Sequence, residues 1–162
     1  MKKTITLVLL TYISLIGALN ASESSNQAFL GHWEHRQINP EMKNGFDPEG
    51  EKLELDEVGG NIVGSYFGIE REGDEVLYYT AVKLKDIKIT GNHISFTVPA
   101  RELFSERPLS ADDGAKKSKT SIGFTRTDLT MGGKLENGKL VLHCTSIDDA
   151  CPADELSFKK GK

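Results

Sequence analysis

The chain has 162 residues, of which 38% are hydrophobic, and its 20 Lys and Arg against 24 Asp and Glu give a formal net charge of −4. This length is enough for one domain with a substantial hydrophobic core. A net negative charge argues against nucleic acid or an anionic membrane as the partner, because both select for clustered Lys and Arg.

Residues 1–21 have the layout of a secretory signal peptide. Two lysines precede an apolar run over 5–19, and small or turn-forming residues end it near Ala21. The run is 15 residues long, short of the roughly 20 residues that a membrane-spanning helix needs. We expect cleavage after Ala21 and export of residues 22–162, with a net charge of −6, as one periplasmic or secreted domain without an integral membrane segment.

Most of the remaining chain alternates between apolar and polar residues with a period of two, which is typical of β-strands. Gly and Asn residues suited to tight turns separate the apolar runs. The pattern predicts strands at 29–38, 51–58, 61–71, 75–84, 86–90, 92–98, 120–130, 133–136, 139–145 and 155–160. It favours an all-β fold, a single antiparallel up-and-down β-barrel of about 8–10 short strands, because an open sheet would leave two long exposed edges.

Two segments interrupt this rhythm, and we expect both to be loops. Asn39–Gly50 holds two prolines and an Asn-Gly pair. Pro99–Lys119 begins with residues that can form one short helical turn, with Pro at its first position. Its Leu103 and Phe104 are candidates for a lid over one end of the barrel or for a partner contact, while the tail beyond Ser110 is expected to be mobile. Connections of this length in a compact domain are usually functional or disordered.

Cys144 and Cys151 are the two cysteines of the chain. In an exported protein such a pair predicts a disulfide, and the spacing differs from the Cys-x-x-Cys of redox and zinc sites. Closing a loop of about eight residues should stabilise the fold by about 2–3 kcal/mol. The nearby acidic pairs Asp148-Asp149 and Asp154-Glu155 lack the interleaved spacing of a calcium-binding loop, so we expect no metal and no cofactor.

The segments Phe29-Leu30-Gly31-His32-Trp33 and Gly60-Asn61-Ile62-Val63-Gly64-Ser65-Tyr66 resemble the lipocalin-like and avidin-like secreted barrels of the calycin type. In those families a Gly-x-Trp motif opens the first strand, and in the avidin-like group a Gly-x-x-x-Gly-x-Tyr pattern follows. The resemblance implies a small secreted barrel with Trp33 at its base and a ligand in its interior. The pairing has a physical reason, because a small Gly admits close neighbours and an indole buries roughly 200 Å².

The chain departs from these families at positions that matter for the ligand. Avidin-like proteins hold biotin between several tryptophans, whereas Trp33 is the single one here, so we do not expect biotin binding. The lipocalin Thr-Asp-Tyr signature is half present as Thr127-Asp128-Leu129. The arginine that covers the lipocalin tryptophan corresponds to either Arg36 or Arg126.

Four residues are candidates for ligand contact: Trp33, His35, Tyr66 and Tyr78. Strand alternation places His35 on the same inner side as Trp33. His35 stands where the avidin-like group has a ligand-facing amide, and Tyr66 matches the ligand-facing tyrosine of that group. Tyrosines that face a cavity supply the few oriented hydroxyls of a small-molecule pocket. The alternative is that His35 is a hydrogen-bonded core residue and the tyrosines are ordinary core or rim packing.

No catalytic motif is present, so we predict no catalytic residue and a non-catalytic binding protein. The favoured function is a lipocalin-like barrel that binds an apolar or amphipathic small molecule. The alternative is a periplasmic inhibitor or immunity-type protein whose acidic charge steers it to a basic cell-wall-degrading enzyme or toxin. An unrecognised hydrolase is the residual alternative. Glu54 and Asp56 share an outward face that suits solvent rather than a buried acid–base pair.

Overall fold

A computed structural model describes residues 26–36, 50–72, 76–112, 121–125, 127–146 and 151–161. The strands in these ranges are β1 (Gly31–His35), β2 (Glu51–Val58), β3 (Asn61–Glu72), β4 (Val76–Lys83), β5 (Lys85–Thr90), β6 (His93–Val98), β7 (Glu102–Phe104), β8 (Ser121–Phe124), β9 (Leu129–Glu136), β10 (Lys139–Thr145) and β11 (Glu155–Lys160). Helical residues in the described ranges are limited to Asn26–Gln27 and Ala111–Asp112. No described helix therefore has the length and apolarity that a bilayer crossing requires.

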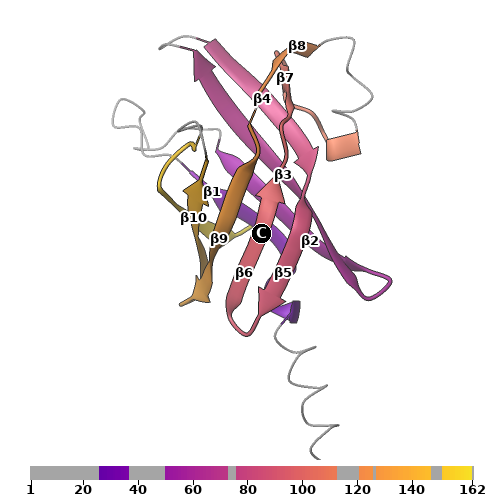
Figure 1. The fold of residues 1–162 in the computed structure, drawn as a ribbon, viewed down its shortest axis with the longest axis vertical. Coiled ribbons are helices and arrows are strands. Elements are labelled where there is room, and N and C mark those ends of the chain that lie inside the picture. Colours follow the sequence, from indigo (N-terminus) through magenta and orange to yellow (C-terminus); the bar gives the residue numbers. More distant parts are fainter. Residues whose placement is uncertain are drawn as a thin grey trace, which may run out of the picture.

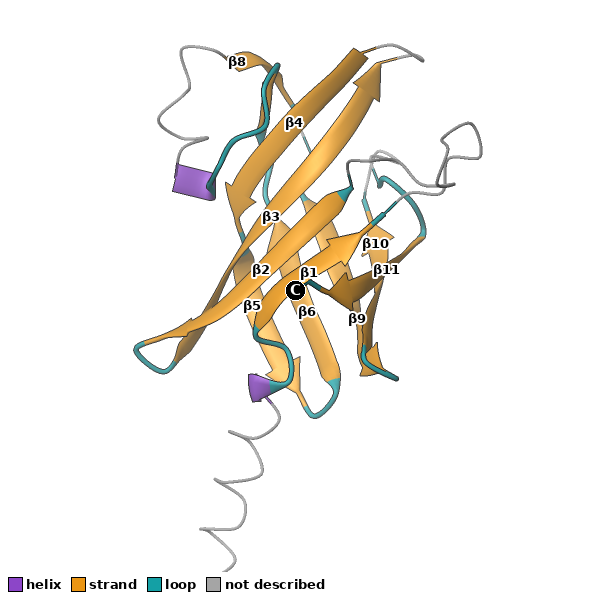
Figure 2. Cartoon of the chain, turned by 180° about the vertical axis from the view of Figure 1, so that it is seen from behind, coloured by secondary structure: helices purple, strands orange, loops and turns teal. Residues whose placement is uncertain are grey.

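The eleven strands form one antiparallel sheet in the order β5-β6-β9-β10-β11-β1-β2-β3-β4-β7-β8, and this sheet curls into a half-barrel (Figures 1 and 2). The first and last strands lie side by side, with Trp33 opposite Lys160. β4 and β5 follow one another with only Leu84 between them, and the Leu84 N–H donates to the Gly64 carbonyl at 2.9 Å. This bond ties the β5 end of the sheet back to β3. The predicted all-β antiparallel fold is confirmed.

The concave side of the sheet holds the main hydrophobic core. Strand alternation sends every second side chain of β2, β6, β9, β10 and β11 to this side, which we call the inner face. The buried core residues are Phe29, Trp33, Leu53, Leu55, Tyr66, Ile94, Phe96, Val98, Leu129, Met131, Leu140, Leu142, Cys144, Leu156 and Phe158. Partly buried residues such as Val82 and Leu84 pack against them.

A second set of buried apolar residues lies on the outer face of β3, β4 and β7. Its members, none of them part of the main core, are Phe67, Ile69, Ala81, Phe104 and Ala111. A segment that we call the strap, Ser105–Asp112, follows the outer face of β4. Its Arg107 guanidinium lies 5.4 Å from the Tyr79 ring centroid, and Asp112 Oδ1 lies 2.6 Å from Lys83 Nζ. The strap therefore covers the outer side of this part of the sheet.

The first part of the Pro99–Lys119 segment differs from the prediction. A helical turn was expected from Pro99, but residues 102–104 form β7, and Phe104 pairs with Tyr79 of β4. Pairing with a distant strand outweighs the local helical preference of this sequence, and it adds an eleventh strand to the sheet. The helical residues of the segment are Ala111 and Asp112 instead, and residues 113–120, where a mobile tail was predicted, lie outside the described residues.

The predicted strands at 120–130 and 133–136 are divided differently in the structure. β8 ends at Phe124, and the Thr125 N–H continues its pairing with the β7 side of the sheet by one bond, to the Arg101 carbonyl at 2.8 Å. β9 then runs without interruption from Leu129 through both of its glycines. At Gly133 a side chain would overlap the Val141 carbonyl oxygen, so glycine is required for close pairing rather than for a turn.

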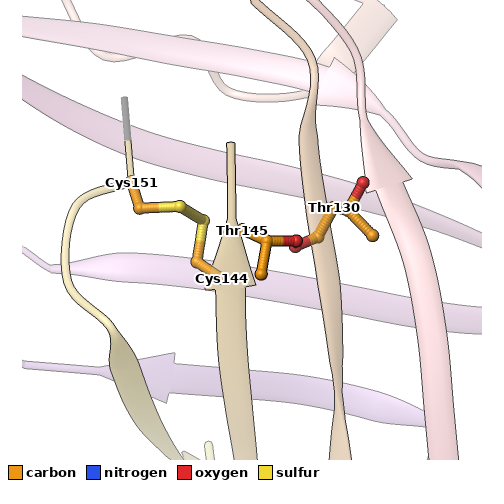
Figure 3. The surroundings of a disulfide bond; sticks show 4 residues. All are labelled: Thr130, Cys144, Thr145 and Cys151. Atoms are coloured by element: carbon orange, nitrogen blue, oxygen red, sulfur yellow. A yellow bond between two sulfur atoms is a disulfide. The ribbon is translucent and has the colours of Figure 1, made fainter. Parts of the chain in front are cut away.

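The predicted disulfide between Cys144 and Cys151 is present (Figure 3). Cys144 lies near the end of β10, and the bond joins it to the chain just before β11, with the two Cα atoms 5.8 Å apart. Thr145 beside it donates its hydroxyl to the Thr130 carbonyl of β9 at 3.4 Å. Such a bond is consistent with an oxidising compartment.

The two terminal strands of the sheet differ in how they are protected. β5 carries Lys85 and Lys88, and its register shifts around Asp86, which adopts a φ of 53°. Lysines and bulges of this kind prevent the pairing of an edge with another chain. β8 has a register shift of its own, between its pairs with Leu103 and Phe104, but it carries no lysine, and its Ile122 and Phe124 side chains are 52% and 66% exposed.

Candidate functional site

The inner face changes from apolar to polar within one step along β1 and β2. The lower row is the register set Trp33, Leu53, Tyr66 and Val82 on four adjacent strands. Two residues further along, His35 pairs with Glu51, and Gly68 pairs with Thr80. Glu51 and Thr80 are 0% and 1% exposed, as buried as the core beneath them, whereas the His35 side chain is 17% exposed. We call this end of the half-barrel, where β1 ends and β2 begins, the rim.

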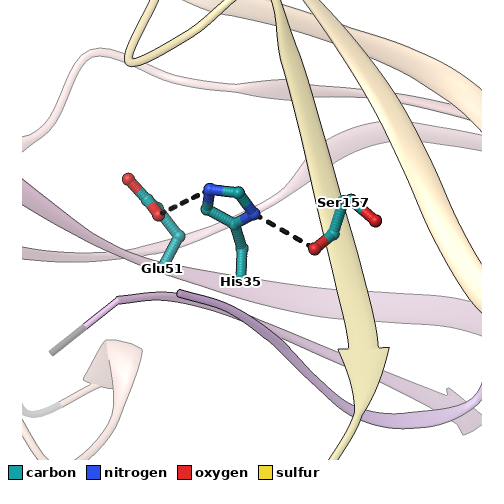
Figure 4. Close-up of polar contacts among 3 residues, drawn as sticks. All are labelled: His35, Glu51 and Ser157. Carbon is teal, nitrogen blue, oxygen red and sulfur yellow. Dashed lines mark hydrogen bonds and ion pairs between the residues drawn. The ribbon is translucent and has the colours of Figure 1, made fainter. Parts of the chain in front are cut away.

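His35 lies between Glu51 and Ser157 (Figure 4). Its Nδ1 is 3.1 Å from the Ser157 carbonyl oxygen, and its Nε2 is 4.0 Å from Glu51 Oε2. A carbonyl oxygen can only accept, so Nδ1 carries the proton, and an ion pair with Glu51 exists only when both ring nitrogens are protonated. The ring also packs on Phe158, with centroids 5.6 Å apart.

These three residue types are those of a hydrolytic triad, but the geometry is different. The histidine contacts the backbone carbonyl of Ser157, which has no proton to give up, rather than its hydroxyl. A triad requires a hydrogen bond from the nucleophilic hydroxyl to the imidazole. The contact therefore orients the ring of His35 instead of activating a serine.

Tyr66, from the apolar row, and Arg101 border the polar row at Gly68 and Thr80. A Cβ on Gly68 would meet Tyr66 Cε1 at 2.7 Å and Thr80 Oγ1 at 2.8 Å, so the tyrosine ring folds over the space that this glycine leaves. The Arg101 guanidinium stands 5.9 Å from the centroid of the same ring, and Arg101 is 5% exposed. The backbone of Arg101 is held by Thr125, whose hydroxyl accepts its N–H at 3.0 Å.

Buried charge is the chemical feature of this end of the molecule. Glu51 and Arg101 are the buried ionisable residues of the described chain. Removing a carboxylate and a guanidinium from water costs several kcal/mol per ion before any pairing is counted. Charged side chains are almost never fully buried unless they are paired, so these two residues stand out from an ordinary core. The polar row is therefore the strongest candidate for a site.

A hollow of about 230 Å³ opens beside the polar row at the rim. The residues that line this rim hollow are Glu34, His35, Arg36, Gly50, Glu51, Lys52 and Arg107. The lining carries both signs of charge, with three arginine or lysine side chains and two glutamates. Arg36 Nη2 lies 3.6 Å from Glu34 Oε2, and Arg107 is held against Tyr79 by the strap. A polar group of a small molecule would find both signs of charge there.

The shape of the rim hollow depends on Gly50. A Cβ at this position would overlap the His35 carbonyl oxygen, and it would come within 3.1 Å of the Arg36 Cα. The chain that enters β2 therefore passes directly against the end of β1, which only glycine permits. This contact brings the Glu51 and His35 side chains to the same place.

The structure brings three of the four predicted contact residues together. Trp33 and Tyr66 belong to the apolar row, and His35 lies just above Trp33. Tyr78 is half-buried near the start of β4, two residues before Thr80. Trp33 is 1% exposed, and its Nε1 donates to the Phe29 carbonyl at 2.7 Å.

Other residues of the sequence hypothesis lie elsewhere. Phe104, a candidate lid over the barrel end, is buried on the outer face of β4, and Leu103 is half-buried beside it in β7. The cation over the Trp33 ring is Lys160 Nζ, 5.4 Å from the centroid, whereas Arg36 lines the rim hollow. Arg126 lies outside the described residues.

Sequence reasoning missed Glu51, Arg101 and Arg107. For Glu51 a signal existed, because it shares the parity of Leu53 and Leu55 and so is a carboxylate on an apolar face. No comparable signal marks the two arginines, since they belong to the connection between β6 and β8 and reach the site through contacts distant in sequence.

No metal site emerges from the part of the chain that the structure describes, where no three His, Cys, Asp or Glu side chains gather. The acidic pair Asp148-Asp149 lies outside those residues. Comparison with family models, with curated proteins and with solved structures finds no match to this chain.

Proposed function

We propose that this protein is an exported, non-catalytic binding protein that takes an amphipathic small molecule at its rim. The polar part of the ligand would occupy the rim hollow beside His35, Glu51 and Arg107. The single observation that carries this proposal is the buried polar row directly above an apolar core. The leader-like segment 1–21 and the disulfide support the export part of the proposal.

Size and charge support a ligand of this kind. A hollow of about 230 Å³ is below the range of roughly 300–1,000 Å³ typical of drug-sized pockets, so it suits a head group rather than a whole molecule. The apolar part would contact the half-buried side chains at the edge of the core. His35 and Tyr66 would orient the ligand, as expected for candidate contact residues.

The test uses the amphipathic fluorophore 1-anilinonaphthalene-8-sulfonate and decanoate, followed by backbone amide shifts. We expect shifts at His35 and Gly50–Lys52, and several-fold weaker binding in the double variant Arg107→Gln, Lys52→Gln. The matched control, Lys85→Gln with Lys88→Gln on β5, removes the same charge far from the rim. Equal binding by both double variants, or shifts confined to other parts of the sheet, would overturn the proposal.

A second candidate function is an inhibitor or immunity-type protein for a basic cell-wall-degrading enzyme or toxin. One observation favours it, namely that the outer face of β2 and β3 combines exposed aliphatic side chains with carboxylates. Val58 and Val63 are 62% and 44% exposed there, beside Glu54 and Asp56. A net negative protein would be steered electrostatically toward a basic partner.

A further inference from the structure

The outer face of β2 and β3 carries a second hollow, of about 220 Å³, that no part of the strap is seen to fill. The residues that line this side hollow are Glu54, Asp56, Val58, Val63, Gly64, Ser65 and Lys83. It lies beyond the rim hollow along β2, and the two share no lining residue. The two hollows therefore use different side chains.

Val58 and Val63 make the apolar part of the side hollow. They are two of the five large hydrophobic residues that are exposed in the described chain. Asp56 pairs with Val63 across β2 and β3, which places a carboxylate next to this aliphatic surface. Exposed aliphatic surface with a polar border is an arrangement that many interaction sites share.

The charge of the side hollow is negative. Glu54 and Asp56 face outward from β2, and His32 Nδ1 holds Glu54 Oε1 at 3.2 Å. Lys83 is the basic residue of the lining, and its Nζ lies 2.6 Å from Asp112 Oδ1 of the strap. Because Asp112 of the strap already pairs with Lys83, the charge of Glu54 and Asp56 makes the side hollow negative overall.

Size, aliphatic surface and charge together match one kind of occupant. A hollow of about 220 Å³ accommodates a single long side chain. Arginine buries an aliphatic stem while its charged head reaches a polar border. Its flat guanidinium presents five donors that suit a pair of carboxylates better than the compact ammonium of lysine does. Arginine is also among the residues that dominate the binding energy of protein interfaces.

We propose that the side hollow receives an arginine side chain of a basic protein partner, with its stem on Val58 and Val63 and its guanidinium between Glu54 and Asp56. This inference rests on the second candidate function and gives it a contact site. It does not depend on the small-molecule site at the rim. Loss of ligand binding in the Arg107→Gln, Lys52→Gln variant would therefore leave it unaffected.

The experiment titrates the intact protein with the capped peptide acetyl-Gly-Arg-Gly-amide and follows amide shifts. A citrulline peptide of the same shape without the charge and a norleucine peptide without the polar head are the comparison probes. We expect the arginine peptide to shift Val58 and Val63, and both comparison peptides to bind several-fold more weakly. Raising the salt concentration should weaken the arginine peptide alone.

Variants separate the proposed site from general charge attraction. Glu54→Gln with Asp56→Asn should weaken the arginine peptide roughly three- to tenfold, as expected for two partly exposed charge contacts. Val63→Ser should weaken both the arginine and the norleucine peptides. The control pair Glu136→Gln with Glu155→Gln removes the same two negative charges away from β2 and should leave binding nearly unchanged.

Three results would overturn the inference. They are equal affinity for the arginine and citrulline peptides, equal weakening by the two charge-removing pairs, and peptide-induced shifts outside β2 and β3. The substituted side chains at 54, 56 and 63 lie on the outer face, so the variants should keep the native spectrum elsewhere. That spectrum shows directly whether each variant is folded.

Discussion

Gly132 and Gly133 are neighbours in β9 with opposite surroundings. A Cβ on Gly133 would overlap the Val141 carbonyl oxygen, whereas one on Gly132 would meet nothing within 4 Å. We expect Gly133→Ala to lower the free energy of unfolding by about 1–3 kcal/mol, because the β9–β10 pair must move apart. Gly132→Ala, the matched control, should be neutral or slightly stabilising, since it only reduces the freedom of the unfolded chain. Urea unfolding followed by circular dichroism compares the two, and similar midpoints would contradict the prediction.

Trp33 contributes both volume and a hydrogen bond to the lower end of the core. Trp33→Phe removes the Nε1 donor and leaves the Phe29 carbonyl oxygen without that bond, in a place where Trp33 is 1% exposed. We expect a loss of about 2–3 kcal/mol in the free energy of unfolding from the smaller ring and the unmet acceptor. Phe124→Leu, at a 66% exposed position, should change it by less than about 0.5 kcal/mol. Chemical denaturation measures both, and a Trp33→Phe variant as stable as the control would show that the indole is dispensable.

At the level of elements, the strap and β7 are held to the sheet mainly by Phe104. This side chain is 2% exposed on the outer face, opposite Tyr79. Phe104→Ala should lower the free energy of unfolding by about 3–4 kcal/mol, because it opens a cavity under the strap. Leu109→Ala in the same segment, 88% exposed, should cost less than about 0.5 kcal/mol.

Hydrogen exchange distinguishes a local effect of Phe104→Ala from a global one. If β7 and the strap are anchored as described, amides of residues 102–112 should exchange faster at low denaturant than those of β2 and β3. Uniform acceleration across the sheet would show instead that the outer apolar set and the main core form one cooperative unit.

At the level of the whole molecule, β8 is the edge of the sheet where we expect self-association, because it carries exposed apolar side chains. Phe124→Lys places a charge on this edge and should reduce self-association on concentration, because lysine blocks pairing with another chain. Thr130→Lys adds the same charge to an exposed position of β9, a strand that already has two neighbours. Static light scattering at rising concentration should separate the two variants, and an equal reduction would point to net charge rather than to the edge.

The sequence predicts a feature of this fold when residues close together in the chain determine it, and fails when the contact joins residues far apart in the chain. The β2–β3 hairpin follows from local chemistry, since Gly59 and Gly60 adopt φ values of 60° and 79°. Strand parity likewise places His35 beside Trp33. The connection after Pro99 was predicted wrongly, because its structure comes from pairing with Tyr79, 25 positions before Phe104. No local pattern contains such a contact.

The same limit applies to the site. One half of the rim hollow comes from β1 and β2, where alternation and Gly50 could be read from the sequence. The other half depends on Arg107, which arrives through the strap and is held by a ring on β4. Its position follows from the assembled sheet, so a single sequence could name His35 as inward but not the cation that faces it.

The pairing of β1 with β11 places the first and last strands of the described chain side by side in the middle of the sheet. The Gly161 N–H donates to the His32 carbonyl at 2.8 Å, so a peptide that joins residue 161 to residue 26 would connect two adjacent strands. The chain could then be cut at the exposed turn Gly91-Asn92, as circular permutation tolerates. A permuted protein of this design would retain every neighbour relation of the half-barrel, including both hollows, while its new ends would lie away from them.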